Sequence, residues 1–369
     1  MLLLTALESC SPRMFIARRI LPFVFLPLLT ETVVSKSQSG VGLGADRRAV
    51  VDGTAKAIED NYIFPDIAQK MARALRDRSS AREYDGITVD DVFAERLTRD
   101  LYETGRDRHI KVFQPRSRDA RNSMVVPVTK EREQQDEAWV NHGFSEVKRL
   151  AGNVGYLKVD RLLPTGAAAD TANAAMKFLS DASALIIDLR DNRGGSPEMI
   201  KLLCTYLFES GRRVHLNDFQ WRGQPQLVES YTLTSVPGTS FAGTPVFMLT
   251  SHHTFSGAEE FAYDLQSLQR AIIIGEATGG GANPGRVFQL PQGFFVFVPT
   301  GRAINPVTKT NWEGVGVKPD IQVPSAVAVD VAHLAALRAI NRSPHLEPDQ
   351  EQEVQESIKL LEKRIVPPS

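Results

Sequence analysis

A serine that opens a predicted helix is the first candidate for chemistry in this sequence. Ser256 follows a short strand-like run, and Gly257 comes immediately after it, at the start of an amphipathic helix pattern. A helix N-terminus carries a partial positive charge, which would stabilise an oxyanion formed beside this hydroxyl. The same residues also fit a capping box, because Glu259 stands three positions after Ser256. The local pattern by itself favours the cap over a nucleophile.

Two glycine-rich junctions lie on either side of this serine in the sequence. Gly194 and Gly195 follow the apolar strand-like run of residues 184–189, and glycines there let backbone N–H groups face a ligand. An ordinary tight turn is their alternative interpretation. The second junction is a run of three glycines: Gly279, Gly280 and Gly281. This run lacks the Lys-Ser/Thr pair of a phosphate-binding loop, so we expect a loop that leaves room for an extended substrate.

A serine hydroxyl needs a base to take its proton, and histidines are the first residues to consider. His252 and His253 are close in sequence, but on a strand they would point to opposite faces, so at most one would approach Ser256. The two cysteines exclude a four-cysteine zinc site, and the seven histidines show no HExxH-type spacing. We therefore expect neither a metal nor another cofactor.

The elements that must position these residues change character along the chain. Residues 46–114 carry apolar residues at helical spacing, which predicts a small all-helical N-terminal domain. Residues 115–145 are polar, charged and without a period, as in a linker or an exposed flap. In residues 146–325, strand-like runs alternate with helical patterns of ten or more residues, which predicts an α/β core with a largely parallel sheet. Residues 326–369 are expected to form C-terminal helices.

Composition narrows the class of protein. The chain has 369 residues, of which 42% are hydrophobic and 24% charged, values typical of a globular protein. The formal net charge of −1 argues against a nucleic-acid partner, which would normally be bound by a basic stripe. Nothing in the composition decides the oligomeric state.

The beginning of the sequence resembles a targeting segment. Arg18 and Arg19 precede an apolar run over residues 20–29, so residues 1–39 are expected to be a signal peptide. An amphipathic or disordered leader is the alternative. The run is shorter than the ~20 apolar residues that a membrane-spanning helix needs. We expect an exported protein, periplasmic or secreted, with a cleaved leader and no integral membrane segment in the mature chain.

Four motifs, taken together in their order and separations, resemble peptidase family S41. They are DLRDNRGG, TFSGAEEFA, GEATGGGANPG and NWEGVGVKPDI. This family of serine peptidases includes the tail-specific (C-terminal processing) proteases, the tricorn core and the interphotoreceptor retinoid-binding protein modules. The segment GRDRHIKV also resembles the N-terminal domain of the retinoid-binding-protein-like branch. The resemblance covers roughly residues 47–325 and implies a ClpP/crotonase-like α/β peptidase core, preceded by a small helical domain.

The resemblance assigns roles at the two junctions. It implies that Ser256 is the nucleophile and that the Gly257 N–H forms an oxyanion hole with the N–H of Gly194 or Gly195. Tail-specific proteases use a lysine as the base, and the position that matches it here is Gly281. A Ser-Lys dyad is therefore excluded at that position, and the PDZ module of that branch is not expected either.

The resemblance to the tricorn-like branch implies a different base. There the base is a histidine from another segment, which His109 matches, and Glu313 in NWEGVGV matches the acidic member. Glu313 would orient the imidazole or stabilise the imidazolium, directly or through an intermediary. Residue 108 is Arg where the tricorn pattern has a serine, so that linking hydroxyl is absent. A structural histidine is the alternative for His109, whereas an unperturbed catalytic imidazole predicts a rate that rises with pH through about 6.5.

The sequence therefore predicts an exported serine peptidase that hydrolyses peptide or protein substrates through an acyl-enzyme. Two alternatives stay open: a non-catalytic module that binds an apolar, retinoid- or lipid-like ligand on the same fold, and an esterase for small acyl substrates. The presence of Ser256, His109 and Glu313 together with both glycine junctions favours catalysis, because a passive carrier has no physical need for them.

Overall fold

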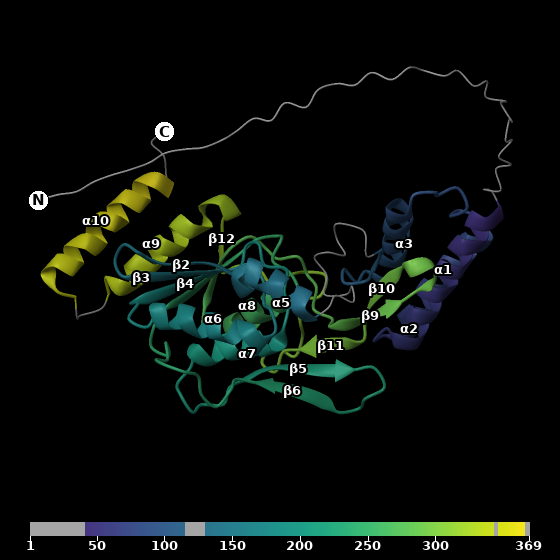
Figure 1. Cartoon of the computed structure of the whole chain (residues 1–369). Coiled ribbons are helices and arrows are strands. Elements are labelled where there is room, and N and C mark those ends of the chain that lie inside the picture. Colours follow the sequence, from purple (N-terminus) through teal and green to yellow (C-terminus); the bar gives the residue numbers. More distant parts are fainter. Residues whose placement is uncertain (1–40, 115–129, 343–345, 366–369) are drawn as a thin grey trace, which may run out of the picture. The chain divides into compact units, whose positions relative to one another are not determined.

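The computed structural model describes residues 41–114, 130–342 and 346–365, drawn in colour in Figure 1. The predicted signal peptide lies outside the described residues, as does the first half of the predicted linker. In the described ranges, no helix combines the length and apolar character that a membrane crossing requires. Residues 40–369 form one compact unit, to which the following description is confined.

Three helices build the N-terminal region, at the spacing that the sequence predicts. They are α1 (Val41–Asn61), α2 (Pro65–Ser80) and α3 (Asp90–Gly105). Proline is well suited to the first position of α2, because the first N–H groups of a helix have no acceptor within it. Arg106 ends α3 in the left-handed conformation, with φ of 56°, and so turns the chain toward a short strand.

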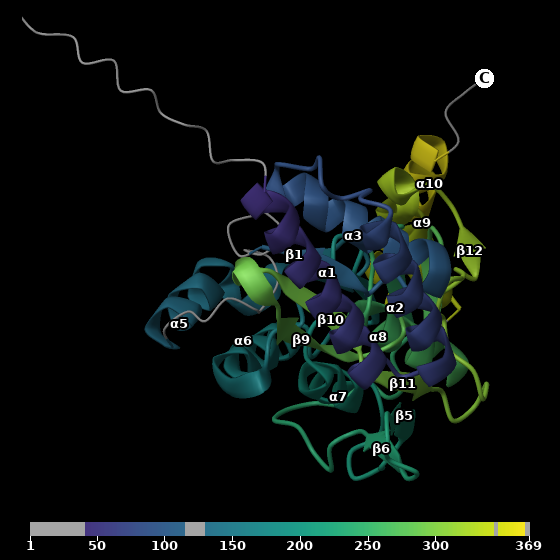
Figure 2. The ribbon, with the colours of Figure 1, turned by 90° about the vertical axis from the view of Figure 1, so that its right-hand side faces the viewer.

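The N-terminal region is not all-helical, and this part of the prediction is wrong. Strand β1 (Lys111–Phe113) pairs antiparallel with β10 (Phe295–Pro299), which in turn pairs with β9 (Gly285–Gln289). One face of this sheet joins the apolar core of the three helices, where α1 packs against β10 (Figure 2). Strands β9 and β10, more than 170 residues after β1 in the sequence, thus complete the N-terminal core. No local sequence pattern contains this pairing.

The predicted, largely parallel core sheet is present and has six strands. Its order is β12-β8-β7-β4-β3-β2, and only the β2–β3 pair is antiparallel. The strands are β2 (Phe144–Leu150), β3 (Val154–Val159), β4 (Ala184–Asp188), β7 (Val246–Thr250), β8 (Ile272–Gly275) and β12 (Ile321–Gln322). Parallel strands end at the same edge of a sheet, which gathers the loops after β4, β7 and β8 into one place.

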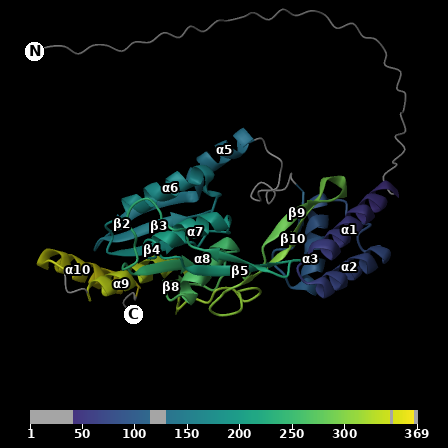
Figure 3. The ribbon, with the colours of Figure 1, turned by 90° about the horizontal axis from the view of Figure 1, so that it is seen from below.

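Helices cover both faces of this sheet (Figures 1 and 3). One face packs against α6 (Thr165–Phe178), α7 (Pro197–Tyr206) and α8 (Gly257–Ser267). The other face packs against α9 (Ala328–Ile340) and α10 (Pro348–Ile365). Strands that are buried on both faces have continuous apolar sequences, and this pattern predicts β4 and β7 from the sequence.

Two further features were not predicted. A second antiparallel sheet has the order β11-β5-β6 and consists of β5 (His215–Trp221), β6 (Leu227–Tyr231) and β11 (Gly301–Ile304). Within the predicted linker or flap, helix α5 (Lys130–Trp139) and the 3-10 turn η1 (Asn141–Gly143) precede β2. The α5 sequence consists mostly of strong helix formers without an apolar stripe, so periodicity did not detect it.

Candidate active site

Ser256 occupies the sharp turn between β7 and α8. Its φ of 55° and ψ of −125° lie in a region that residues other than glycine rarely adopt, and such backbone strain is common at functional sites. The Ser256 N–H donates to Glu259 Oε2 at 2.8 Å, as the predicted capping box requires. The Ser256 hydroxyl oxygen lies 2.9 Å from Nε2 of His109. Capping and a hydroxyl–imidazole contact therefore coexist at one residue.

His109 reaches this hydroxyl from the loop between α3 and β1. Its ring centroid is 4.6 Å from that of Phe255 and 5.7 Å from that of Phe297. Burial disfavours the charged imidazolium and lowers the pKa of His109 to about 4. The imidazole is therefore neutral at pH 7, which is the form in which Nε2 accepts a proton.

Asp107 is a buried carboxylate beside this histidine that the sequence interpretation missed. Its Oδ1 accepts the backbone N–H of His109 at 2.9 Å. Its Oδ2 accepts the Tyr62 hydroxyl at 3.2 Å and the Asn283 side-chain amide at 2.9 Å. Burial raises the pKa of Asp107, while these hydrogen bonds oppose the rise. An Asp two positions before His109 has the spacing of an Asx turn, and that was the available signal.

Glu313 lies close to the same imidazole without a direct hydrogen bond to it. Its Oε2 accepts the backbone N–H groups of Ala282 at 2.6 Å and Asn283 at 3.2 Å. One carboxylate oxygen of Glu313, one of Asp107 and a ring nitrogen of His109 all lie within 4.8 Å of one another. Among the described residues, His109 Nδ1 and Glu313 Oε1 are buried without a hydrogen-bond partner. Burial and the neighbouring Asp107 raise the pKa of Glu313 to about 8.

The glycines expected to form the oxyanion hole lie against Ser256, but their N–H groups differ. The Gly194 N–H donates to Asn192 Oδ1 at 2.8 Å, so it is already occupied. The Gly195 N–H has no acceptor among the described residues. Gly257 is the first residue of α8, and the first N–H groups of a helix have no acceptor within the helix. A Cβ on Gly257 would lie 3.1 Å from the Gly195 nitrogen. The close approach of the two backbones therefore favours glycine at this position. Of the two glycines that the resemblance offered beside Gly257, only Gly195 has an N–H without an acceptor in the described part of the chain.

Glu259 connects the nucleophile turn to the glycine loop. Besides the Ser256 N–H, its carboxylate accepts the N–H groups of Gly280 at 2.6 Å and Gly281 at 2.8 Å, and the Thr278 hydroxyl. Burial raises the pKa of Glu259, and the hydrogen bonds that it accepts lower it. The glycine loop is therefore held in place by the residue that also caps α8.

Gly281 has no room for a side chain. A Cβ there would overlap the Phe255 ring and lie 2.7 Å from Cε1 of His109. The carbonyl of neighbouring Gly279 accepts a hydrogen bond from the Arg108 guanidinium, which ties this loop to the one that carries His109. The position that a lysine occupies in the tail-specific pattern is thus closed by the Phe255 ring and the His109 imidazole.

His252 and His253 do not reach the serine. They lie in the turn after β7, which ends at Thr250, so the expectation that they alternate on a strand is wrong. The two ring centroids are 3.9 Å apart, and His252 Nδ1 hydrogen-bonds Glu276 Oε2 at 2.9 Å. Neither histidine has a described contact with Ser256.

Two clusters of described residues have ligand types that suit a divalent metal such as Zn²⁺. They are Asp107 with His109 and Glu313, and His215 with Asp218 and Glu229. In the first, both Asp107 oxygens and Glu313 Oε2 accept hydrogen bonds from the protein. In the second, the His215 ring already hydrogen-bonds Asp218 at 2.6 Å. We assign no metal to either cluster.

Comparison with known proteins identifies the class that this fold and site define. The model of peptidase family S41 matches residues 153–323. A second model, described as the N-terminal domain of peptidase S41 in eukaryotic IRBP, matches residues 30–145. The chain therefore belongs to peptidase family S41, as its motifs implied.

Curated relatives match only part of their length. The chain is 29% identical over 180 residues to chloroplastic carboxyl-terminal-processing peptidase 2 of Arabidopsis thaliana, which covers 48% of this chain and 33% of that protein. With carboxyl-terminal-processing peptidase 1 of the same plant it shares 26% identity over 193 residues, 50% of this chain and 36% of that protein. The chain thus spans about a third of the length of these relatives.

Solved structures share the fold. A candidate peptidase from Parabacteroides merdae superposes with a TM-score of 0.56 at 20% identity, covering 85% of this chain and 96% of that one. The photosystem II D1 C-terminal processing protease gives a TM-score of 0.51 at 14% identity, covering 77% of this chain and 94% of that one. The predicted α/β peptidase core with a helical N-terminal region is confirmed.

Proposed function

We propose that this protein is a serine peptidase that cleaves peptide or protein substrates through an acyl-enzyme. The observation that carries the proposal is the 2.9 Å separation of Ser256 Oγ and His109 Nε2. A hydroxyl beside a neutral imidazole is the arrangement in which a serine becomes nucleophilic. Membership of peptidase family S41 supports this hydrolase activity. The exported location inferred from residues 1–39 remains part of the proposal and rests on the sequence.

The geometry supports the following reaction sequence. The Ser256 hydroxyl gives its proton to His109 Nε2 while Oγ attacks the scissile carbonyl carbon, and the oxyanion accepts the N–H groups of Gly195 and Gly257. The imidazolium then protonates the leaving amine, the C–N bond breaks and the acyl group stays on Oγ. A water molecule then gives a proton to the same nitrogen and attacks the acyl carbon. The bond between Oγ and the acyl carbon breaks, the acid leaves, and Nε2 returns the proton to Ser256 Oγ. The Glu313 carboxyl lies beside the His109 ring and, when ionised, stabilises the imidazolium while it carries the extra proton.

Labelling with a fluorophosphonate probe tests the nucleophile. We expect the probe to label the wild type at Ser256, and Ser256→Ala to abolish the label while the circular dichroism spectrum still shows the folded protein. Ser267→Ala, at the other end of α8, is the matched control and is expected to keep the label. A folded wild type that takes no label would contradict the proposal and favour a passive binding module for an apolar ligand.

A further inference from the structure

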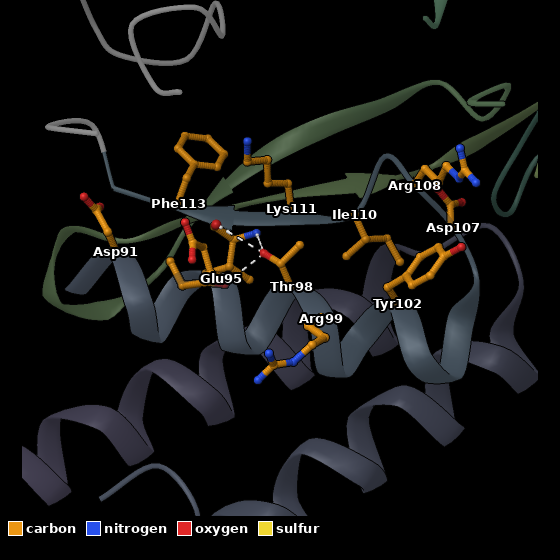
Figure 4. A pocket seen from close by; sticks show the side chains of 12 residues that line it. Asp91, Glu95, Thr98, Arg99, Tyr102, Asp107, Arg108, Ile110, Lys111 and Phe113 are labelled. Carbon is orange, nitrogen blue, oxygen red and sulfur yellow. Dashed lines mark hydrogen bonds between the residues drawn. The ribbon is translucent and has the colours of Figure 1, made fainter. Parts of the chain in front are cut away.

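The small sheet β1-β10-β9 has two faces of different character. Alternate residues of a strand point to opposite faces, and one set here lies in the apolar core of the N-terminal helices. The other set carries three phenylalanines, which we call the aromatic face: Phe113, Phe295 and Phe297. Figure 4 shows Lys111 and Phe113 on the side of β1 that points away from α3, with Ile110 on the opposite side. Phe295 and Phe297 are partly exposed.

The aromatic face is continuous with the candidate base. The Phe297 ring stacks on the His109 imidazole, with a centroid distance of 5.7 Å and an interplanar angle of 29°. Phe295 and Phe113 are directly opposite in the strand register, and their rings stack at 5.9 Å and 18°. A strand advances about 3.3 Å per residue, so Phe295 lies about 7 Å beyond Phe297 along β10. A row of rings therefore leads away from the imidazole.

The reaction chemistry decides which part of a substrate meets this row. The N–H groups of Gly195 and Gly257 hold the carbonyl oxygen of the substrate. The leaving amine must accept its proton from His109 Nε2. The residues C-terminal to the scissile bond therefore begin at His109, whose ring adjoins Phe297. An extended peptide advances about 3.3 Å per residue, so its first four residues after the bond span the distance to Phe295.

We propose that the aromatic face binds the leaving-group side of the peptide substrate and selects apolar side chains within four residues after the scissile bond. This inference rests on the proposed function. Phe113 is buried, whereas Phe295 and Phe297 offer ring surface to a ligand. Covering that surface with an apolar side chain lowers the free energy of the complex, because apolar surface is removed from water. We assign the selectivity to Phe295, because Phe297 stacks on the imidazole and Phe113 is buried.

Matched peptide substrates test this inference. Each pair carries Phe or Ala at one of the four positions after the scissile bond, and kcat/KM is measured for both. For the wild type we expect a preference for Phe of about tenfold at one or more positions, and for Phe295→Ala a preference below about twofold. Phe295→Leu is expected to restore most of it, which separates lost contact from misfolding. Phe178→Ala, an exposed phenylalanine on α6, is the matched control and keeps the wild-type ratio.

Each result decides between the two proposals. Ser256-dependent hydrolysis with the same preference in wild type and Phe295→Ala overturns the inference and leaves the proposed function intact. A preference confined to residues before the scissile bond overturns it as well. Absence of any Ser256-dependent hydrolysis overturns both.

Discussion

The nucleophile and the base are held in place by two different kinds of contact. Ser256 is positioned locally, by the turn between β7 and α8 and by Glu259 three residues later. His109 is positioned through Asp107, whose partners Tyr62 and Asn283 are 45 residues before it and 176 residues after it. The nucleophile turn can therefore form within the core, whereas the base is correctly placed only when the N-terminal region packs against the glycine loop.

The two regions also surround their ionisable groups with different environments. The core surrounds the Glu259 carboxylate with N–H and hydroxyl donors. The N-terminal region buries His109, and this burial disfavours the charged imidazolium. The nucleophile turn is thus fixed by hydrogen bonds to Glu259, whereas the pKa of His109 depends on how the surrounding residues pack.

Removing the base is expected to have the largest effect. His109→Gln keeps a polar side chain of similar size but cannot take the serine proton, so kcat/KM at pH 7 should fall by about 10² to 10⁴. His252→Gln is the matched control and should leave kcat/KM unchanged, because His252 hydrogen-bonds Glu276 instead. A large loss in His252→Gln with activity kept in His109→Gln would place the base in the core and break the comparison.

The pH dependence of the rate measures how far burial lowers the pKa of His109. His109 must be neutral to act as a base, and burial lowers its pKa to about 4. The rate should therefore stay level as the pH falls from 7 to about 5 and then drop about tenfold per unit below about 4. The profile of kcat/KM, taken where the protein remains folded, checks this. An acid limb at about 6.5, as for an unperturbed imidazole, would contradict the buried environment.

Cutting the link between the two regions is expected to have an intermediate effect. Asp107→Asn turns an amide donor toward the Asn283 amide, so we expect kcat to fall about tenfold with little change in KM. The double variant Asp107→Asn with Asn283→Asp exchanges donor and acceptor and should recover most of the loss. Tyr62→Phe removes only a contact within the N-terminal region and should cost less. Failure of the exchange to recover kcat would mean that Asp107 does not position the base through Asn283.

The smallest effect at pH 7 is expected for Glu313→Gln. Since burial and Asp107 raise the pKa of Glu313 to about 8, the carboxyl is largely neutral at pH 7 and glutamine imitates it. We expect a loss of no more than about threefold at pH 7 that grows above pH 8, where the wild type gains the carboxylate. Rates of both proteins at pH 6, 7 and 9 make the comparison. A loss at pH 7 as large as that of Ser256→Ala would show that an ionised Glu313 is essential.

Local patterns predicted most of the elements because each is a short-range property. The buried strands β3, β4 and β7 appear as apolar runs, and α3 appears as an amphipathic helix. The sheet formed by β5, β6 and β11 was missed, since its strands are partly exposed and β11 lies about 80 residues after its partner β5. Helix α5 was missed because it has no apolar stripe, although its residues favour a helix.

The candidate site was predictable to the extent that a resemblance supplies residue types. His109 and Ser256 were matched to motifs, and the structure brings them to hydrogen-bond distance. Asp107 carries no motif of its own, and its importance appears only when Tyr62 and Asn283 are seen to converge on it. Likewise, only the hydrogen bond to Asn192 distinguishes the Gly194 N–H from that of Gly195.

The amino-acid sequence by itself determined which groups are present: a serine at a helix start, glycines that follow the strands, and a histidine in a distant segment. Tertiary structure alone decided that this histidine meets the serine, that burial keeps it neutral, and that Gly281 leaves the space it needs. The reason is physical. Residue type and spacing govern interactions within a few residues, whereas proton affinity and contact depend on what the folded chain packs around each group.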